Sequence, residues 1–258
     1  MSGKKPWFQC SLLLNDIYFQ GLVLPRWQIT PKYLVYFMDS TILFSLRLSL
    51  QVAFVATLAV IVVGVYVAYL LARKDFRGKE FVDILFTLPL VLPPTVTGYY
   101  LIILFGRNGF LGRYIYDLTG WSIMFTWYAA ALASFVVALP LMVKTSRAAF
   151  ESVDKSLIEA SFTLGHTELK TALKVIIPIA KRGIIAGAIL SFARALGEFG
   201  ATLMVAGNIP GKTSTMPLTI YSLANSGEWS RANILVIFFT CMSGVFLYVA
   251  NKLSKRLA

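Results

Sequence analysis

Two side chains of opposite charge, Arg194 and Glu198, stand within an otherwise apolar stretch of this sequence. In a helix, their spacing of four residues places both charged groups on one face, where each neutralises the other. Ionisable residues inside apolar segments commonly mark the paths of ions or polar solutes. Two interpretations are therefore open: a structural pair that fixes this helix against a neighbour, or a pathway pair that contacts a charged solute. Thr202, about one helical turn further on, is a candidate for the same pathway.

Three prolines interrupt another apolar stretch, at Pro89, Pro93 and Pro94, and Thr95 follows them directly. Each proline removes a backbone donor and clashes with the preceding turn, so a helix at this point must kink or partly unwind. Within a membrane, freed backbone groups are tolerated only where they are buried in protein or line a watery cavity. We therefore predict that Pro93, Pro94 and Thr95 border a pathway, with a packing kink as the alternative.

The longest polar connection carries the signals of two short helices. Ser156 and Glu159 have the spacing of a capping box, in which each side chain bonds the backbone amide of the other residue. Gly165 suits the left-handed conformation that ends a helix, and Thr167 can cap a second helix that stops or bends near Pro178. The first helix presents apolar side chains outside any membrane span, so we expect them to dock into another protein. These side chains are Leu157, Ile158 and Phe162.

The composition indicates which elements position these residues. Of 258 residues, 57% are hydrophobic and 14% are charged, against about 25% charged in an ordinary soluble domain. So few charges cannot cover a soluble core, and we predict an all-α integral membrane protein. Apolar segments of about 20 residues, enough to cross the hydrocarbon layer, occur five times. The predicted spans are 43–71, 84–105, 122–143, 184–206 and 233–250, in one transmembrane domain at 41–252 that follows an N-terminal tail or interfacial segment, 1–40.

The distribution of positive charge predicts the orientation. Loops 72–83 and 144–183, together with the C-terminal tail 253–258 and Lys252, hold 14 of the 24 basic residues, and the opposite connections and the N-terminal segment hold 8. Because basic residues favour the cytoplasmic side, we expect the N-terminus outside and the C-terminus in the cytoplasm. Five spans also place the two ends on opposite sides. The net charge of +12 then requires no nucleic-acid partner.

Few residues suit enzymatic chemistry or ion coupling. The single histidine, His166, is interpreted as a solvated or interface residue, and Cys10 and Cys241 as free thiols, so no metal site and no catalytic group are predicted. Proton or sodium coupling needs intramembrane carboxylates, and only Glu198 qualifies, which makes a secondary transporter the weaker alternative. Segment 207–213 resembles a phosphate-binding loop, but it has three residues between its glycines where such a loop has four. We therefore expect no ATP hydrolysis by this chain.

The polar loop 144–183 resembles that of a known family. Its pattern is similar to the EAA motif of permease subunits in binding-protein-dependent ATP-binding cassette importers. The matching positions are Glu159, Ala160, Ser161, Gly165, Val175, Ile177 and Pro178. Three of them differ mildly from the usual motif, in which alanine, isoleucine and leucine stand at Ser161, Val175 and Ile177. The resemblance implies a cytoplasmic coupling helix whose contact with the ATP-hydrolysing subunit is made by Glu159, Ala160, Ser161 and Gly165.

The resemblance covers roughly residues 40–252 and is greatest to the molybdate permease subgroup, with sulfate and tungstate permeases as alternatives. Stretches 88–94, 106–112, 193–202 and 207–213 carry it. It implies the type I ABC importer permease fold and a homodimer in a prokaryotic plasma membrane, with the pathway at the twofold interface. The implied partners are two ATP-binding cassette subunits, which hold ATP and Mg²⁺, and an extracytoplasmic oxyanion-binding protein; no cofactor is implied in this chain. Gly211 and Lys212 are candidate contacts for the binding protein, with a simple turn as the alternative.

Overall fold

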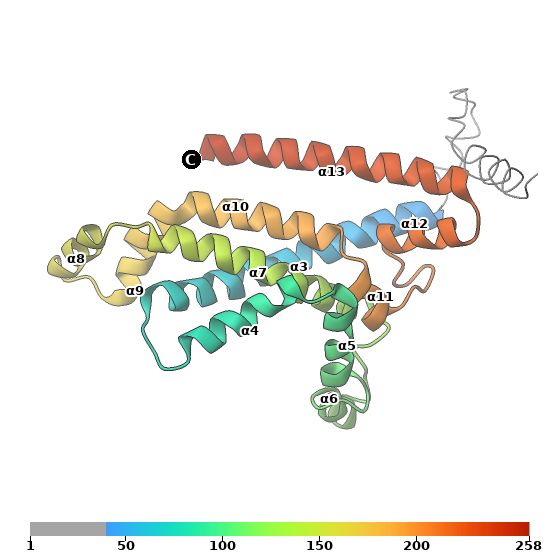
Figure 1. Ribbon diagram of the computed structural model, residues 1–258, viewed down its shortest axis with the longest axis horizontal. Helices are drawn as coiled ribbons and strands as arrows, with labels where there is room; N and C mark the ends of the chain where they lie inside the picture. Colours follow the sequence, from blue (N-terminus) through green and yellow to red (C-terminus); the bar gives the residue numbers. More distant parts are fainter. Residues whose placement is uncertain (1–39, 258) are drawn as a thin grey trace, which may run out of the picture. The chain divides into compact units, whose positions relative to one another are not determined.

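The computed structural model describes residues 40–257, so the predicted N-terminal segment lies outside the described residues apart from Ser40. Regular structure in the described range is entirely helical (Figure 1). The helices are α3 (Ser40–Arg73), α4 (Lys79–Val91), α5 (Pro94–Phe105), α6 (Gly112–Thr119), α7 (Trp127–Glu151), α8 (Lys155–Thr163), α9 (Glu168–Thr171), the π turn η2 (Ala172–Ile176), α10 (Ile177–Leu196), α11 (Gly200–Ala206), α12 (Met216–Asn225) and α13 (Trp229–Leu257).

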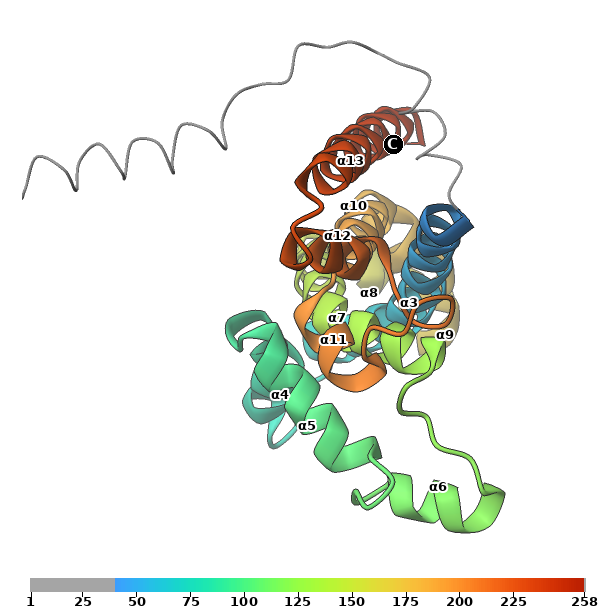
Figure 2. The same cartoon turned by 90° about the vertical axis from the view of Figure 1, so that its right-hand side faces the viewer.

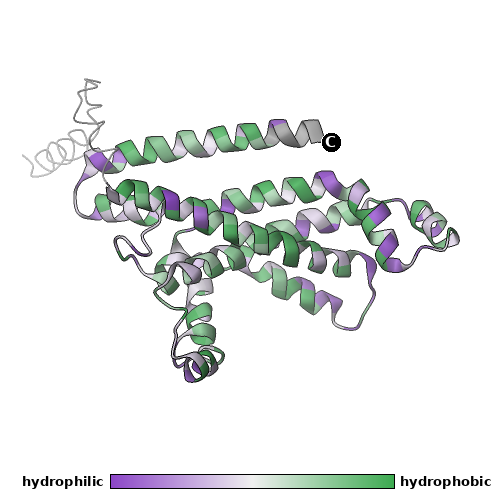
Figure 3. Cartoon of the chain, turned by 180° about the vertical axis from the view of Figure 1, so that it is seen from behind, coloured by the Kyte–Doolittle hydropathy of each residue, from purple (hydrophilic) through white to green (hydrophobic). Residues whose placement is uncertain are grey.

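Within the described residues, four helices are long and apolar enough to cross a membrane. They are Ser40–Arg73, Trp127–Glu151, Glu168–Leu196 and Trp229–Ala250. The first has 34 residues, or about 51 Å at 1.5 Å per residue, against a hydrocarbon layer of about 30 Å. Apolar residues follow the bodies of these helices, and hydrophilic residues gather mostly toward their ends (Figure 3). The prediction of an all-α membrane protein is thus supported, but five continuous spans are not.

The predicted span 84–105 is two helices. α4 ends at Val91 and α5 begins at Pro94, and Pro93 between them has an extended backbone, with φ −52° and ψ 136°. The two prolines explain the break, since neither can donate a backbone hydrogen bond and the residue before a proline avoids the helical conformation. The 12 residues of α5 reach only about 18 Å. Figure 1 shows α5 running across the direction of α4.

The predicted span 184–206 is also broken, because α10 ends at Leu196 and α11 begins only at Gly200. At its other end this helix is longer than expected. The helix that begins at Glu168 does not stop at Pro178: it continues through the π turn into α10. A π turn widens the helix where the proline ring would meet the preceding carbonyl groups, so the chain accommodates Pro178 without ending the helix.

The third predicted span, 122–143, begins five residues late and extends to Glu151. Phe125 adopts a positive φ of 58°, and its amide donates to the Val205 carbonyl over 3.0 Å, which holds this residue against α11. Thr126 then caps α7 by accepting from the Ala129 amide at 3.3 Å. These tertiary and capping contacts set the helix start, which hydrophobicity alone did not predict. The short helices α6 and α12 were not predicted either.

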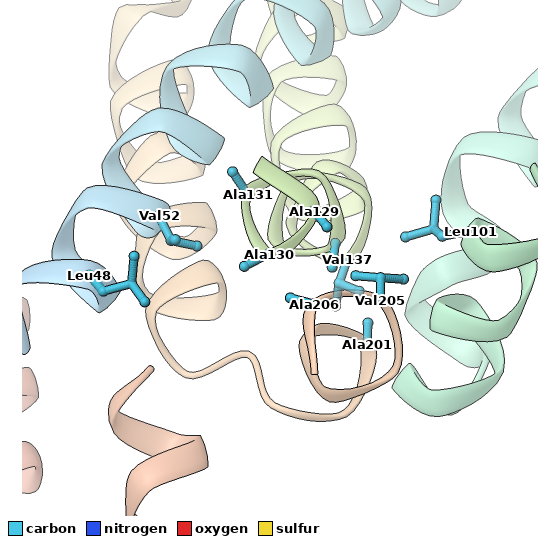
Figure 4. Packing of buried hydrophobic residues seen from close by; sticks show 11 residues of the cluster. Leu48, Val52, Leu101, Ala129, Ala130, Ala131, Val137, Ala201, Val205 and Ala206 are labelled. Atoms are coloured by element: carbon cyan, nitrogen blue, oxygen red, sulfur yellow. The ribbon is translucent and has the colours of Figure 1, made fainter. Parts of the chain in front are cut away.

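The buried centre lies where α3, α5, α7 and α11 meet (Figures 2 and 4). Its residues are mostly small, so the helix backbones approach closely. The cluster comprises Leu48, Val52, Leu101, Ala129, Ala130, Ala131, Ala133, Val137, Ala201, Val205 and Ala206. Two glycines of α10 extend the close packing along α7: Gly183 faces Ala149, and Gly187 faces Thr145 and Met142. A side chain at either position would overlap α7, so these glycines permit the close approach of the two helices.

Candidate functional site

The two broken segments meet at their breaks. A Cβ added to Gly200, the first residue of α11, would lie 3.2 Å from Pro94 Cβ and 3.3 Å from Thr95 Cγ2 at the start of α5. Further along, a Cβ on Gly98 of α5 would lie 3.0 Å from the Ala201 Cα. The glycines therefore allow α5 and α11 to touch backbone to backbone. The structure brings the predicted pathway residues Pro94 and Thr95 beside the helix that carries Thr202.

Glu198 joins the two halves of the second broken segment. Its side chain is buried, and its Oε1 accepts a hydrogen bond from the Ala201 amide at 2.8 Å, within the first turn of α11. Its Oε2 lies 2.7 Å from the Arg194 guanidinium at the end of α10, and 32% of the Arg194 side chain is exposed. A negative charge also interacts favourably with the amino end of a helix. Glu198 thus links α10 to α11 and replaces backbone bonds that the break removes.

Two hydroxyl groups near this junction are buried without a partner. Thr97 on α5 and Thr202 on α11 are 5% and 1% exposed. Among the residues that the structure describes, neither Oγ1 atom has a hydrogen-bond partner. A buried hydroxyl without a partner costs free energy in this conformation. Of the predicted pathway residues, Thr202 therefore has a buried hydroxyl group without a hydrogen bond to any described residue, whereas Pro93 and Thr95 are exposed.

The second candidate site is α8 and the chain around it. Asp154 caps α8 by accepting from the Ser156 amide at 2.9 Å, and this bond holds the pKa of the Asp154 carboxyl below its ordinary value. The predicted capping box of Ser156 and Glu159 is therefore wrong: the helix begins one residue before Ser156, so Ser156 lies within it. Gly165 has the expected positive φ, 79°. Thr167 accepts from the Lys170 amide at 3.5 Å, as a cap of α9.

The exposed face of α8 includes Glu159 and Ala160, and it continues past the end of the helix to the exposed Gly165. Apolar side chains accompany them: Leu157, Phe162 and Leu164 are 48%, 47% and 78% exposed. Such a face, outside the long apolar helices, has the character of a protein contact. The expectation for Ile158 is wrong, because Ile158 packs against buried residues of its own chain.

Ser161 points inward instead of toward the exposed face of α8. It is 4% exposed, and its Oγ lies 2.9 Å from Thr171 Oγ1 and 3.1 Å from His166 Nδ1. His166 is therefore half-buried and bonded within the loop, where we expected a solvated or interface residue. This network ties α8 to α9. The sequence placed Ser161 in the motif, but nothing local indicated the direction of its side chain.

The loop that contains Gly211 and Lys212 forms a turn that is held by hydrogen bonds within the loop itself. Both residues are exposed, and Gly211 has a φ of 73°. Thr213 is buried beneath them: its Oγ1 accepts from the Ile209 amide at 3.0 Å and donates to the Gly207 carbonyl at 3.2 Å. A true phosphate-binding loop holds phosphate with its backbone amides. Here the amides of Lys212 and Thr213 donate instead to the Ile209 carbonyl, at 3.0 and 2.9 Å. Sequence reasoning missed Thr213, whose buried role depends on this turn.

The chain is similar to several known transport proteins. The family model of the binding-protein-dependent transport system inner membrane component matches residues 60–258. The molybdenum transport system permease protein ModB of Haemophilus influenzae is 42% identical over 214 residues, 83% of this chain and 93% of that protein. The sulfate transport system permease protein CysT of Salmonella typhimurium is 32% identical over 252 residues, 96% of this chain and 89% of that protein.

A solved bacterial ABC transporter involved in the import of the acidic polysaccharide alginate superimposes with a TM-score of 0.74, at 14% identity, over 97% of this chain and 96% of that chain. At this identity the likeness concerns the fold alone. The match of the family model over most of the chain and the identity to ModB decide the relationship. This chain belongs to the family of binding-protein-dependent transport system inner membrane components.

Proposed function

We propose that this chain is the membrane-spanning subunit of an ATP-driven importer and forms half of the pathway for an oxyanion, molybdate in particular. The observation that carries the proposal is the 42% identity to a molybdenum permease over 93% of that protein. Sulfate is the second candidate, because a sulfate permease aligns with 96% of this chain, at 32% identity. Tungstate shares the charge and shape of molybdate and enters by the same route in this proposal.

In the proposed topology, α4 and α5 together make one crossing, so the chain from α3 to α13 crosses the membrane five times. The end that carries α8 faces the cytoplasm. This orientation is supported by the basic residues near that end, among them Arg73, Lys74, Lys144 and Arg147. The N-terminus then lies outside and the C-terminus inside. Gly211 and Lys212 lie on the outer side, where the exposed Lys212 is available to a binding protein.

The exposed face of α8 is the proposed contact for an ATP-binding cassette subunit. Glu159, Ala160 and Gly165 contribute to this face directly, and Ser161 supports it from within through Thr171. ATP and Mg²⁺ act in that partner, and this chain performs no covalent chemistry. Two copies of the chain form the pathway between them, and each binds one ATPase subunit.

The pathway switch is proposed at the α5–α11 junction. Unwound segments precede both helices, at Leu92–Pro93 and at Gly197–Phe199. The close contacts that Gly98 and Gly200 make across the junction let α5 and α11 move as a unit. Pro93 and Thr95 are exposed at this unit, while Arg194 and Glu198 keep α11 attached to α10. Weak binding along such a path suits an importer, because a tightly held anion would be released slowly.

Uptake of labelled molybdate by cells that produce the complete importer tests the proposal. We expect uptake that requires ATP and the binding protein and that excess tungstate reduces but sulfate does not. Glu159→Lys should leave insertion and assembly intact while abolishing uptake, because it reverses the charge on the exposed face of α8. Uptake inhibited by sulfate alone would reassign the substrate, and normal uptake by Glu159→Lys would refute the role of α8.

A further inference from the structure

The end of α3 contacts the chain on both sides of α8. On the side before α8, the Arg73 guanidinium donates to the carbonyl groups of Phe150 and Val153, with the second bond at 3.3 Å. Phe150 lies in the last turn of α7, and Val153 lies in the link to α8. The last carbonyls of a helix have no partner within it, and a guanidinium is well suited to satisfy them.

On the side after α8, Glu168 at the start of α9 binds the same end of α3. Its carboxylate lies 2.7 Å from Lys74 Nζ, and Tyr69 donates a longer bond of 3.5 Å. The bond to Glu168 raises the pKa of Lys74 above its ordinary value. This pair is about half exposed, so it contributes less than the Arg73 bonds. We call Tyr69, Arg73 and Lys74 the α3 clasp.

A buried apolar cluster fills the space between these polar contacts. Ala68 of α3, Phe150 of α7, Val153, and Ile176 and Ala180 of the η2–α10 helix form it, and Ile158 of α8 packs against it. Tyr69 adds an edge-on contact with Phe150, with ring centroids 6.0 Å apart. Close packing of this kind transmits displacement because it leaves little room for independent movement.

We infer that the α3 clasp is a positioning element that carries the displacement of α8 into α3, in addition to the helices α7 and α10 that adjoin α8 in the chain. The inference rests on the proposed function of α8 as the contact for an ATPase subunit. Arg73 is the principal residue, since it bonds two backbone groups and does not depend on an exposed ion pair. Lys74 and Glu168 fix the other side of α8.

The test uses the complete importer in proteoliposomes and measures three quantities: co-purification of the ATPase subunit, basal ATP hydrolysis, and its stimulation by the loaded binding protein. We expect Arg73→Gln to leave co-purification and basal ATP hydrolysis unchanged. The variant should reduce the stimulation by the binding protein about fivefold or more, as loss of a charge-assisted bond implies. Arg73→Lys keeps the positive charge but has fewer hydrogen-bond donors, so it should retain part of the stimulation that Arg73→Gln loses. Arg77→Gln is the matched control, because Arg77 is exposed in the link between α3 and α4 and its replacement makes the same change in charge.

Lys74 and Glu168 provide a second measurement that does not depend on the folding of the Arg73 variants. Lys74→Glu alone should weaken the stimulation, and the exchange Lys74→Glu with Glu168→Lys should recover it. With Cys10 and Cys241 replaced by serine, Lys74→Cys and Glu168→Cys joined by a short bismaleimide should still transport, because the two positions move together.

Transport blocked by this link, or full stimulation in Arg73→Gln with assembly intact, would overturn the inference. If the unmodified importer shows no stimulation by its loaded binding protein, the proposed function itself fails. The two failures are therefore distinguishable.

Discussion

Variants of Glu198 separate two contributions to stability: the negative charge beside Arg194 and the oxygen that accepts from the Ala201 amide. Glu198→Ala removes the acceptor of the Ala201 amide and leaves Arg194 without its partner. The lost bond is charge-assisted and buried, which is worth about 1.5–3 kcal/mol. The lost ion pair adds about 1 kcal/mol or less, because one third of the Arg194 side chain is exposed and can turn to water. The sum is about 2–4 kcal/mol.

Glu198→Gln keeps an oxygen that can accept from the Ala201 amide and loses only the charge, so we expect a loss of about 1 kcal/mol. The exchange Arg194→Glu with Glu198→Arg restores opposite charges, but arginine cannot accept the bond from the amide. We therefore expect the exchange to resemble Glu198→Ala. If only the attraction between opposite charges mattered, the exchange would instead be as stable as the unmodified protein.

The assay is thermal unfolding of the purified protein in detergent, followed by the loss of the monodisperse peak in size-exclusion chromatography. With about 2–4 °C per kcal/mol, Glu198→Ala and the exchange should lower Tm by roughly 5–15 °C and Glu198→Gln by about 2–4 °C. A Tm for the exchange equal to that of the unmodified protein would refute the capping role. Equal losses in Glu198→Gln and Glu198→Ala would show that charge, and not the acceptor, holds the two helices together.

Three further predictions concern helix contacts. Gly187→Val places a Cβ 2.9 Å from Met142 Sδ, and overpacking of α10 on α7 should cost about 1–3 kcal/mol in thermal unfolding; an unchanged Tm would contradict this contact. Asp83→Asn removes the ion pair of 2.9 Å that holds α4 to Arg147, so amide exchange in α4 should become faster while α7 is unaffected. Thr202→Val replaces an unpartnered buried hydroxyl by a methyl group and should raise Tm slightly, and a large loss of stability would show that this hydroxyl has a partner.

The break at Leu92–Pro93 was predictable because its cause is local. Single prolines are tolerated within helices here, as at Pro89 in α4 and Pro140 in α7. Two adjacent prolines remove two backbone donors and restrict the residue before each ring, so Pro93 and Pro94 predict the end of α4 from sequence alone. The break after Leu196 carries no proline, and the stretch reads as continuous helix. It persists because Glu198 caps α11 and because Gly200 packs on α5, and both contacts involve residues that come together only in the folded chain.

The loop that holds α8 and α9 shows the same division. Gly165 and Thr167 act on their own neighbours, and both roles were predicted correctly. The direction of Ser161 depends on Thr171, ten residues away. Arg73 and Lys74 were visible only as positive charges near a span end, because their partners Phe150 and Glu168 are distant in sequence. Charge counting indicates which side of the membrane such residues prefer, but it gives no information about what they bind.

The two ends of the helix bundle are built in different ways, and this difference bears on the mechanism. At the α8 end, ion pairs, bonds from Arg73 and large side chains such as Phe150 join three helices, so independent movement there would break specific contacts. At the α5–α11 junction, the contacts are made by alanine and glycine, and the buried Thr202 hydroxyl has no partner within residues 40–257. Small residues let the backbones pack closely with few side-chain bonds between them, and an unpaired hydroxyl gains by finding a partner in another arrangement. In the proposed mechanism, a force applied at α8 would therefore pass through a tightly connected end of the bundle and shift α5 and α11 together against the rest of the bundle.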